Sequence, residues 1–239
     1  MVSPVSDTNI EYLETGDRGP RAHRDVARWT EREQLLHEKA ALGFYLSGHP
    51  FDGYAQDIRP IAPTPLRELQ PGNEPRRIAG IVHGMRVQQS RRGRMGIVAL
   101  DDGTGRVELT LFNELFEASR GMLKEDQPLV AEGKVLQDDF TGGLRITVDA
   151  VWDLAAARDR FARGMRITCN GGSSGPKLKE LLGPYRSVGN RGCPVSVAYS
   201  NGTATCEIEL GEDWRVSLQD GLMEGLYAWF QPDNVRVIY

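Results

Sequence analysis

Long hydrophobic runs, paired cysteines and aromatic residues are scarce in these 239 residues. No window approaches the roughly 18 consecutive apolar residues of a membrane-spanning helix, and residues 1–8 lack the basic-then-apolar pattern of a secretion signal. We therefore expect a cytoplasmic protein with no membrane partner. Aromatic residues make up only 8%, but 40% hydrophobic residues are enough for one large or two small domains, each with its own core.

The residue patterns that bind metals or carry redox chemistry are also missing. The cysteines form no C-x-x-C pair and are expected to be buried thiols; they are Cys169, Cys193 and Cys206. The histidines show no H-E-x-x-H spacing; they are His23, His37, His49 and His83. We expect no metal site and no cofactor.

Catalytic motifs are equally absent, since the chain has no glycine-rich phosphate loop and no nucleophile elbow. The acid pairs at 101–102 and 138–139 could hold Mg²⁺ for a nuclease that uses Asp101 and Asp138. Each pair, however, runs into a glycine turn, where aspartate is favoured for its local hydrogen bonds. The turn explanation is preferred, and no catalytic residue is expected.

The formal net charge of -4 conceals an uneven distribution. Lys and Arg number 8 against 12 Asp and Glu in residues 1–75, 14 against 13 in 76–165, and 7 against 8 in 166–239. A protein that binds duplex DNA strongly has a broadly basic surface. Any nucleic-acid contact in this chain must therefore use a local patch.

The amino-terminal third reads as a helical lead-in. Residues 1–29 are predicted to be a flexible leader, and residues 30–75 a helix followed by an extended, proline-rich linker with a turn at 66–69. The helix is placed at 30–46, with Leu35, Leu42 and Leu46 near one face, and ends at Ser47, Gly48 and Pro50.

Residues 76–153 change to a period of about two, which is typical of strands. Five runs are predicted, with a short helix at 113–124, opened by an asparagine cap, between the third and fourth; the runs are 76–88, 94–101, 106–112, 129–137 and 144–152. This order is that of a five-stranded Greek-key barrel of the OB type. Gly80 and Gly84 suit a sharply coiled first strand. A small sandwich would use similar strands, so the order carries the assignment.

A linking helix at 154–164 is predicted to join this barrel to an α+β carboxy-terminal domain at 165–239. Its helices lie near 176–185 and 222–230, both on one sheet face. Its strands are 165–169, 195–200, 204–210, 214–216 and 235–239, with an Asn201-Gly202 hairpin and apolar residues alternating along 204–210. The fold class is therefore multi-domain, β plus α+β.

The sharpest functional signal is an arginine-rich hairpin tip at 88–94. In OB folds this loop and the loop between the last two strands flank the binding face, and the second loop presents Phe140. Cationic groups beside an aromatic ring suit unpaired bases, because stacking tolerates any sequence. Phe112 is expected to pack under the following helix. The candidate contacts to single-stranded DNA are Arg86, Arg91, Arg92, Arg94, Lys134, Phe140 and Arg145.

Aromatic residues gather near the carboxyl terminus, where they suit either a small core or an anchor surface for a partner. The candidates for partner binding are Trp214, Trp229, Phe230 and Tyr239.

Three segments in order carry a family resemblance: EKAALGFYLSGHP at 38–50, GIVALDDGTG at 96–105 and DFTGGLR at 139–145. With them, residues 30–239 resemble the carboxy-terminal region of the bacterial DNA polymerase III alpha subunit. The resemblance implies an OB domain associated with single-stranded template, a terminal domain that docks the tau subunit of the clamp loader, and other replicase subunits as partners.

The family's three catalytic aspartates lie in domains that have no counterpart among the resembling residues, so polymerase activity is not expected. Residues 1–29 also lack the family's sliding-clamp motif, which makes clamp binding doubtful. Two hypotheses remain: a non-catalytic replicase region that binds single-stranded DNA, or a replisome interaction scaffold without DNA binding. The near-neutral charge of residues 76–165 favours the second, and a titration with oligothymidylate separates them.

Overall fold

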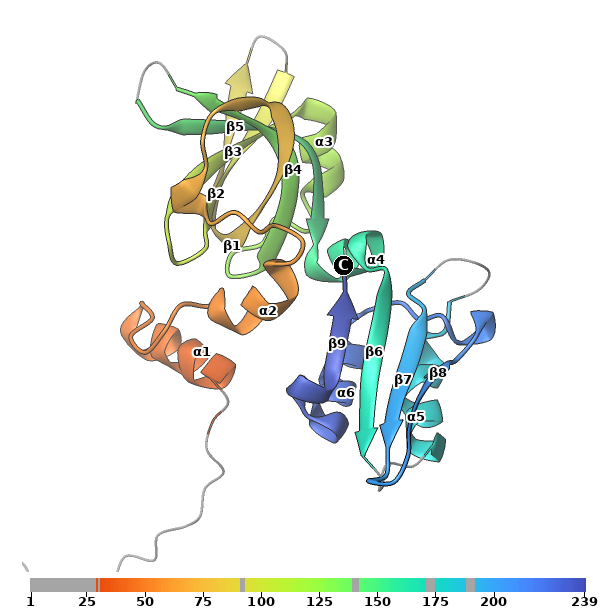
Figure 1. The fold of residues 1–239 in the computed structure, drawn as a ribbon. Helices are drawn as coiled ribbons and strands as arrows, with labels where there is room; N and C mark the ends of the chain where they lie inside the picture. Colours follow the sequence, from red (N-terminus) through yellow and green to blue (C-terminus); the bar gives the residue numbers. More distant parts are fainter. Residues whose placement is uncertain (1–28, 30, 91–92, 139–141, 171–174, 188–191) are drawn as a thin grey trace, which may run out of the picture.

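The computed structural model describes residues 29, 31–90, 93–138, 142–170, 175–187 and 192–239. They form a lead-in segment, a closed five-stranded barrel and a four-stranded sheet with two helices (Figure 1). This confirms the predicted fold class. The leader predicted for residues 1–29 lies, apart from Trp29, outside the described residues. Among those described, no helix is both long and apolar enough to cross a membrane.

The barrel closes in the order β1-β2-β3-β5-β4, with a parallel contact between β3 and β5 and antiparallel contacts elsewhere. Alternate side chains point inward and form one apolar core. The short helix α3 (Asn113–Ser119) follows β3 and is capped by Phe112, without a side-chain cap, so the predicted asparagine cap is wrong. The strands are β1 (Gly72–Ser90), β2 (Gly93–Asp101), β3 (Arg106–Phe112), β4 (Pro128–Gln137) and β5 (Leu144–Asp153).

The two glycines of β1 differ in what they do. A side chain at Gly80 would lie 2.9 Å from the backbone oxygen of Asp101, so the close approach of β1 to β2 requires glycine there. Gly84 has open space around it and sits where the β1–β2 register shifts. Only Gly80 therefore meets the steric need that the sequence predicted for both.

The lead-in is more structured than a linker. Helix α1 (Glu31–Leu42) ends at Gly43, whose φ of +82° stops it before residue 46. Leu35 is buried but Leu42 and Leu46 are exposed, so the predicted common face is wrong. Residues 51–62 pack on the outer wall of the barrel rather than running as an extended linker; they include 3-10 helix η1 (Asp52–Tyr54) and α2 (Ala55–Ile58). The predicted turn is present as η2 (Leu66–Glu68).

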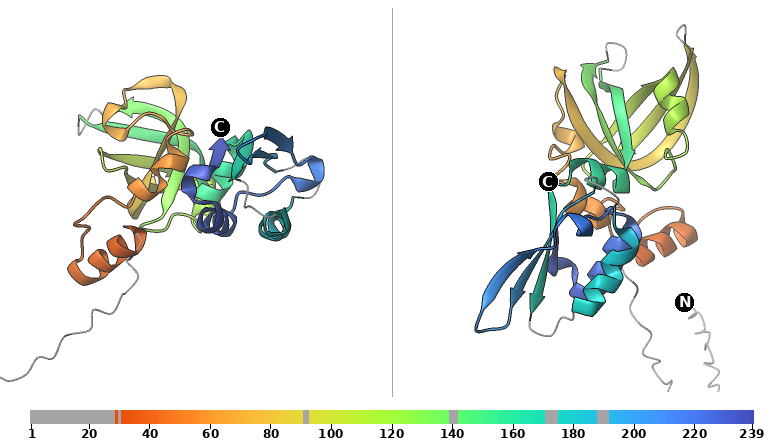
Figure 2. Two further views of the ribbon diagram at one scale, coloured as in Figure 1. Left: turned by 60° about the horizontal axis from the view of Figure 1, so that its bottom comes forward. Right: turned by 90° about the vertical axis from the view of Figure 1, so that its right-hand side faces the viewer.

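The carboxy-terminal sheet has the order β8-β7-β6-β9, with β6 and β7 parallel. Both helices lie on one face (Figure 2), as predicted. Edge strand β8 is exposed along its whole length, so its apolar residues are not core residues. In place of the strand predicted at 214–216, Trp214 ends a 3-10 helix and Val216 forms isolated bridges with Arg186 and Cys193. The elements are β6 (Gly164–Asn170), α5 (Gly175–Leu182), η3 (Gly183–Tyr185), β7 (Val195–Ser200), β8 (Thr205–Glu209), η4 (Glu212–Trp214), α6 (Asp220–Phe230), η5 (Pro232–Asn234) and β9 (Val235–Ile238).

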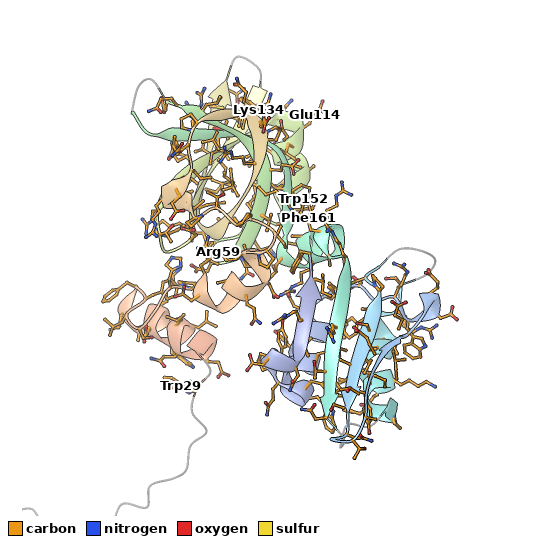
Figure 3. The ribbon with its side chains drawn as sticks, in the orientation of Figure 1. Trp29, Arg59, Glu114, Lys134, Trp152 and Phe161 are labelled. Atoms are coloured by element: carbon orange, nitrogen blue, oxygen red, sulfur yellow. The ribbon has the colours of Figure 1, made fainter. Side chains whose placement is uncertain are left out.

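One buried arginine on the linking helix joins the lead-in to the carboxy-terminal domain. Arg158 lies on the linking helix α4 (Leu154–Phe161), and its guanidinium binds Asp57 of α2 at 2.6 Å and Asp220 of α6 at 2.6 Å. Trp152 of β5 and Phe161 of α4 pack edge to face, where the barrel meets α4 (Figure 3). The lead-in, the linking helix and the carboxy-terminal domain are therefore held together by one ion-pair network.

Candidate nucleic-acid interface

The outer wall of the barrel over β3, β5 and β4 carries polar and basic side chains. Arg145 of β5 lies opposite Glu108 of β3 and Leu136 of β4, while Lys134 lies opposite Thr147. Residues paired across strands share a face, so Lys134 and Arg145 point the same way, and both are exposed. The structure thus brings these two predicted DNA contacts together.

Arg86 joins the same face from β1. Its Nη1 and Nη2 donate to the two oxygens of Glu108 at 2.7 and 2.8 Å, reaching across β2. Glu108 thereby raises the pKa of Arg86 and takes up both of those donors. The face over β1, β3, β4 and β5 therefore brings Arg86, Lys134 and Arg145 together with Glu108, a carboxylate that competes for these cations.

Arg94 faces elsewhere. It has the same strand parity as the inward-pointing residues of β2, and its Nη1 lies 3.7 Å from Oε1 of Glu117 on α3. The predicted contacts Arg91, Arg92 and Phe140 lie outside the described residues. The strand ends that flank 91–92 and 139–141 lie at one end of the barrel, away from the carboxy-terminal domain, in both views (Figures 1 and 2). Lys134 is on the same part of the barrel (Figure 3).

Phe112 is an outward-facing aromatic residue that the sequence prediction misplaced. It is 39% exposed at the end of β3, while Phe116 fills the place under the helix and contacts the position of Gly96. Phe112 has the same strand parity as Glu108 and Thr110, which point outward. The alternation along the strand therefore indicates from the sequence alone that Phe112 points outward. It places the Phe112 ring beside the basic face.

The two acid pairs have structural partners where they are described. The Asp102 carboxylate is fully buried and accepts hydrogen bonds from Leu66 N, Thr104 N and Arg59. Asp101 accepts a bond from Gly103 N at 2.8 Å and lies 3.2 Å from His49 Nε2. Of the second pair, Asp139 is outside the described residues. The described part of the chain contains no group of three or more His, Cys, Asp or Glu suited to a metal ion.

The cysteines are only partly as predicted. Cys169 and Cys193 are buried, and burial raises the pKa of the Cys193 thiol to about 12, so that thiol stays neutral. Cys206 is exposed on β8, contrary to expectation.

The four candidate partner-binding aromatics divide by burial. Phe230 is in the core of the carboxy-terminal domain, and Tyr239 packs against the cluster that joins lead-in, barrel and α4. Trp214 is half-buried, with the Arg186 guanidinium 4.8 Å from its ring. Trp229 is 51% exposed on α6, with Lys177 Nζ 5.5 Å from its ring. Trp229 is therefore the most accessible of the four.

Comparison with known proteins agrees with this architecture. Residues 77–154 match the family model of an OB-fold nucleic acid binding domain, and residues 177–229 match that of the DNA polymerase III subunit alpha C-terminal domain. One similar structure is the second OB-fold domain of replication protein A from Methanococcus maripaludis, 26% identical with a TM-score of 0.31 over 38% of this chain and 92% of that one.

The chain is 37% identical over 222 residues to DNA polymerase III subunit alpha of Pseudomonas aeruginosa, and 35% identical over 215 residues to that of Neisseria meningitidis serogroup A. These matches cover 91% and 89% of this chain but 19% of each relative. The chain thus carries an OB-fold domain followed by a DNA polymerase III subunit alpha C-terminal domain, as the resemblance implied.

Proposed function

We propose that this chain holds single-stranded DNA on the outer face of its barrel and serves a replicative polymerase in the cytoplasm. The observation that carries the proposal is the shared outward face of Lys134 and Arg145, with Phe112 at its edge. Cations that follow a phosphate backbone and a ring that stacks on a base are the two elements of sequence-independent single-strand binding. Arg86 extends this surface. The contacts Arg91, Arg92 and Phe140, predicted from the sequence, remain part of the proposal. Arg94, which faces Glu117 on α3, is proposed only as a peripheral contact to DNA.

The charge on the described face argues for moderate affinity. Glu108 neutralises Arg86, which leaves Lys134 and Arg145 as the cations of that face available to phosphate. Each phosphate contact on single-stranded DNA contributes about -0.7 to the slope of log K against log salt. A shallow but measurable salt dependence follows.

The carboxy-terminal domain is proposed to dock the tau subunit of the clamp loader. Trp229 supports this role because it is 51% exposed, and tryptophan is enriched among the residues that contribute most to protein interfaces. Trp214, which is half-buried in the same domain, is a second candidate contact for the tau subunit. Polymerase chemistry would come from the parts of the relatives that this chain does not match.

The DNA proposal is tested by anisotropy titration of labelled oligothymidylate against the wild type and the variant Lys134→Ala/Arg145→Ala. We expect weaker binding and a salt slope shallower by about 1.4, from two lost contacts. Arg236→Ala is the matched control, because Arg236 is an exposed arginine on β9, far along the chain from the barrel. Equal slopes for wild type and variant would reject the assignment.

An interaction scaffold without DNA binding is the second candidate function. The Arg86–Glu108 pair favours it, because a guanidinium held on both oxygens of a carboxylate is a poor phosphate ligand. This candidate gains support if the wild-type protein fails to bind oligothymidylate at low salt but still binds the tau subunit. Trp229→Ala should then weaken binding to the tau subunit.

A further inference from the structure

Three polar residues of the segment EKAALGFYLSGHP at 38–50 contact the barrel domain. Lys39 forms an ion pair with Asp126, and the Tyr45 hydroxyl donates to the same carboxylate at 3.0 Å. His49 Nε2 lies 3.2 Å from Asp101 Oδ1, while its Nδ1 accepts a hydrogen bond from Phe51 N at 3.2 Å. These contacts fix the lead-in to the barrel and account for the polar residues of the segment.

The large apolar residues of the same segment are exposed. Leu42, Phe44 and Leu46 are 51%, 56% and 71% exposed, so three large apolar side chains within five residues face solvent. A few residues further on, Ile58 and Ile61 are fully buried. Single exposed apolar residues are ordinary on a protein surface, but a cluster of them marks an interaction site.

Hydrogen bonds hold the backbone of this cluster in one conformation. Glu38 Oε2 accepts from Leu46 N at 2.8 Å and from Ser47 N at 2.9 Å, which folds the chain back along α1. Leu42, the last residue of α1, lies one helical turn after Glu38, and the bond from Leu46 N holds the backbone of residue 46 beside the same glutamate. The hydrogen bonds from Ser47 and Leu46 lower the pKa of Glu38 to about 2, so the carboxylate stays ionised near neutral pH. We call Leu42, Phe44 and Leu46 the apolar platform.

We propose that the apolar platform is the docking surface for the polymerase region of a DNA polymerase III alpha polypeptide. The proposal rests on the proposed function, since it assumes that this chain works with such a polymerase. Its occupant follows from length: about four-fifths of each of these relatives lies outside the match, and in them that part belongs to the same polypeptide as this region. The platform itself carries no cation to attract DNA. Because it is already ordered, docking costs little conformational entropy.

The test places a photo-crosslinking amino acid, benzoylphenylalanine, at position 46 of the full chain expressed in its own host. The expected product, after irradiation and mass spectrometry, joins position 46 to a peptide of the polymerase region of an alpha polypeptide. The control carries the same group at Ile208, an apolar residue on β8 that is 50% exposed, and should not give this product. Absence of the product, or a product that joins position 46 to a second copy of this chain or to another protein, would overturn the proposal.

A second measurement separates folding from docking. The variant Leu42→Ser/Leu46→Ser should give at least about tenfold less crosslinked complex, using a crosslinker at position 44, because two leucines no longer enter the interface. Its thermal unfolding and its oligothymidylate affinity should match those of the wild type, because both leucines are exposed and neither belongs to the DNA face. Loss of DNA binding by Lys134→Ala/Arg145→Ala therefore tests the proposed function, and undiminished crosslinking in the serine variant refutes the platform.

Discussion

Arg86 on β1 and Glu108 on β3 form a two-pronged ion pair across β2, with N–O distances of 2.7 and 2.8 Å. Both side chains are largely exposed, so the pair adds little to stability. Its consequence is functional, because Glu108 lies opposite Arg145 as well. One carboxylate thereby lowers the positive potential of the whole proposed DNA face.

Replacing Glu108 should strengthen DNA binding. Glu108→Gln removes the negative charge and frees the Arg86 guanidinium for phosphate, so the salt slope for oligothymidylate should steepen by about 0.7. Glu117→Gln, which removes the partner of Arg94 on α3, is the control and should change the slope less. Weaker binding by Glu108→Gln would mean that the acid helps to shape the site instead of competing for its cations.

Arg158 should matter more for stability than any exposed arginine. Arg158→Ala leaves Asp57 without its cation in a nearly buried position, which typically costs about 3–5 kcal/mol of unfolding free energy. Arg86→Ala, at an exposed pair, should cost at most about 1 kcal/mol. Urea denaturation of both variants compares the two. A loss for Arg158→Ala no larger than that for Arg86→Ala would contradict the joining role of the network.

The glycines of β1 give a matched pair of substitutions. Gly80→Ala forces a side chain to within 2.9 Å of a backbone oxygen that cannot move freely, and should lower stability by about 1–3 kcal/mol. Gly84→Ala meets open space and should be near neutral. Thermal unfolding distinguishes them, and equal effects would show that the barrel does not require the close approach at Gly80.

The stability contributed by Glu38 should depend on pH. Its folded pKa of about 2 is below the ordinary value of 4.5, because Ser47 and Leu46 donate hydrogen bonds to the ionised form. A lowered folded pKa stabilises the protein above the unfolded pKa, and that contribution disappears as the pH falls from about 4.5 to about 2. The difference in melting temperature between wild type and Glu38→Gln should therefore narrow over that window. A constant difference from pH 6 to pH 2.5 would argue against these hydrogen bonds.

The barrel was predictable because its signals are local. Strict alternation in residues 106–112 identified β3 with its observed bounds, and the order of three strands, helix and two strands identified the topology. The same alternation contains the outward direction of Phe112, but the hydrophobicity of a large aromatic residue before a helix favours a core position. Strand parity decides such cases better than hydrophobicity.

Other features depended on contacts between distant segments. Arg158 meets Asp57 across 101 positions and Asp220 across 62, and no local pattern pairs them. Residues 204–210 alternate as a half-buried strand would, yet β8 is an edge strand whose residues are all exposed. Leu42 and Leu46 have helical spacing with Leu35, but Gly43 ends the helix after Leu42, so Leu46 is not on a helical face.

The most direct test of the account is an amide NMR titration of the ¹⁵N-labelled chain with oligothymidylate. If the barrel face binds DNA, the resonances of Thr110, Thr147 and Leu136 will shift in proportion to bound DNA, and those of Ser196 and Ala198 on β7 will not. Shifts confined to the carboxy-terminal sheet, or no shifts at low salt, would contradict the claim that this face holds a single strand.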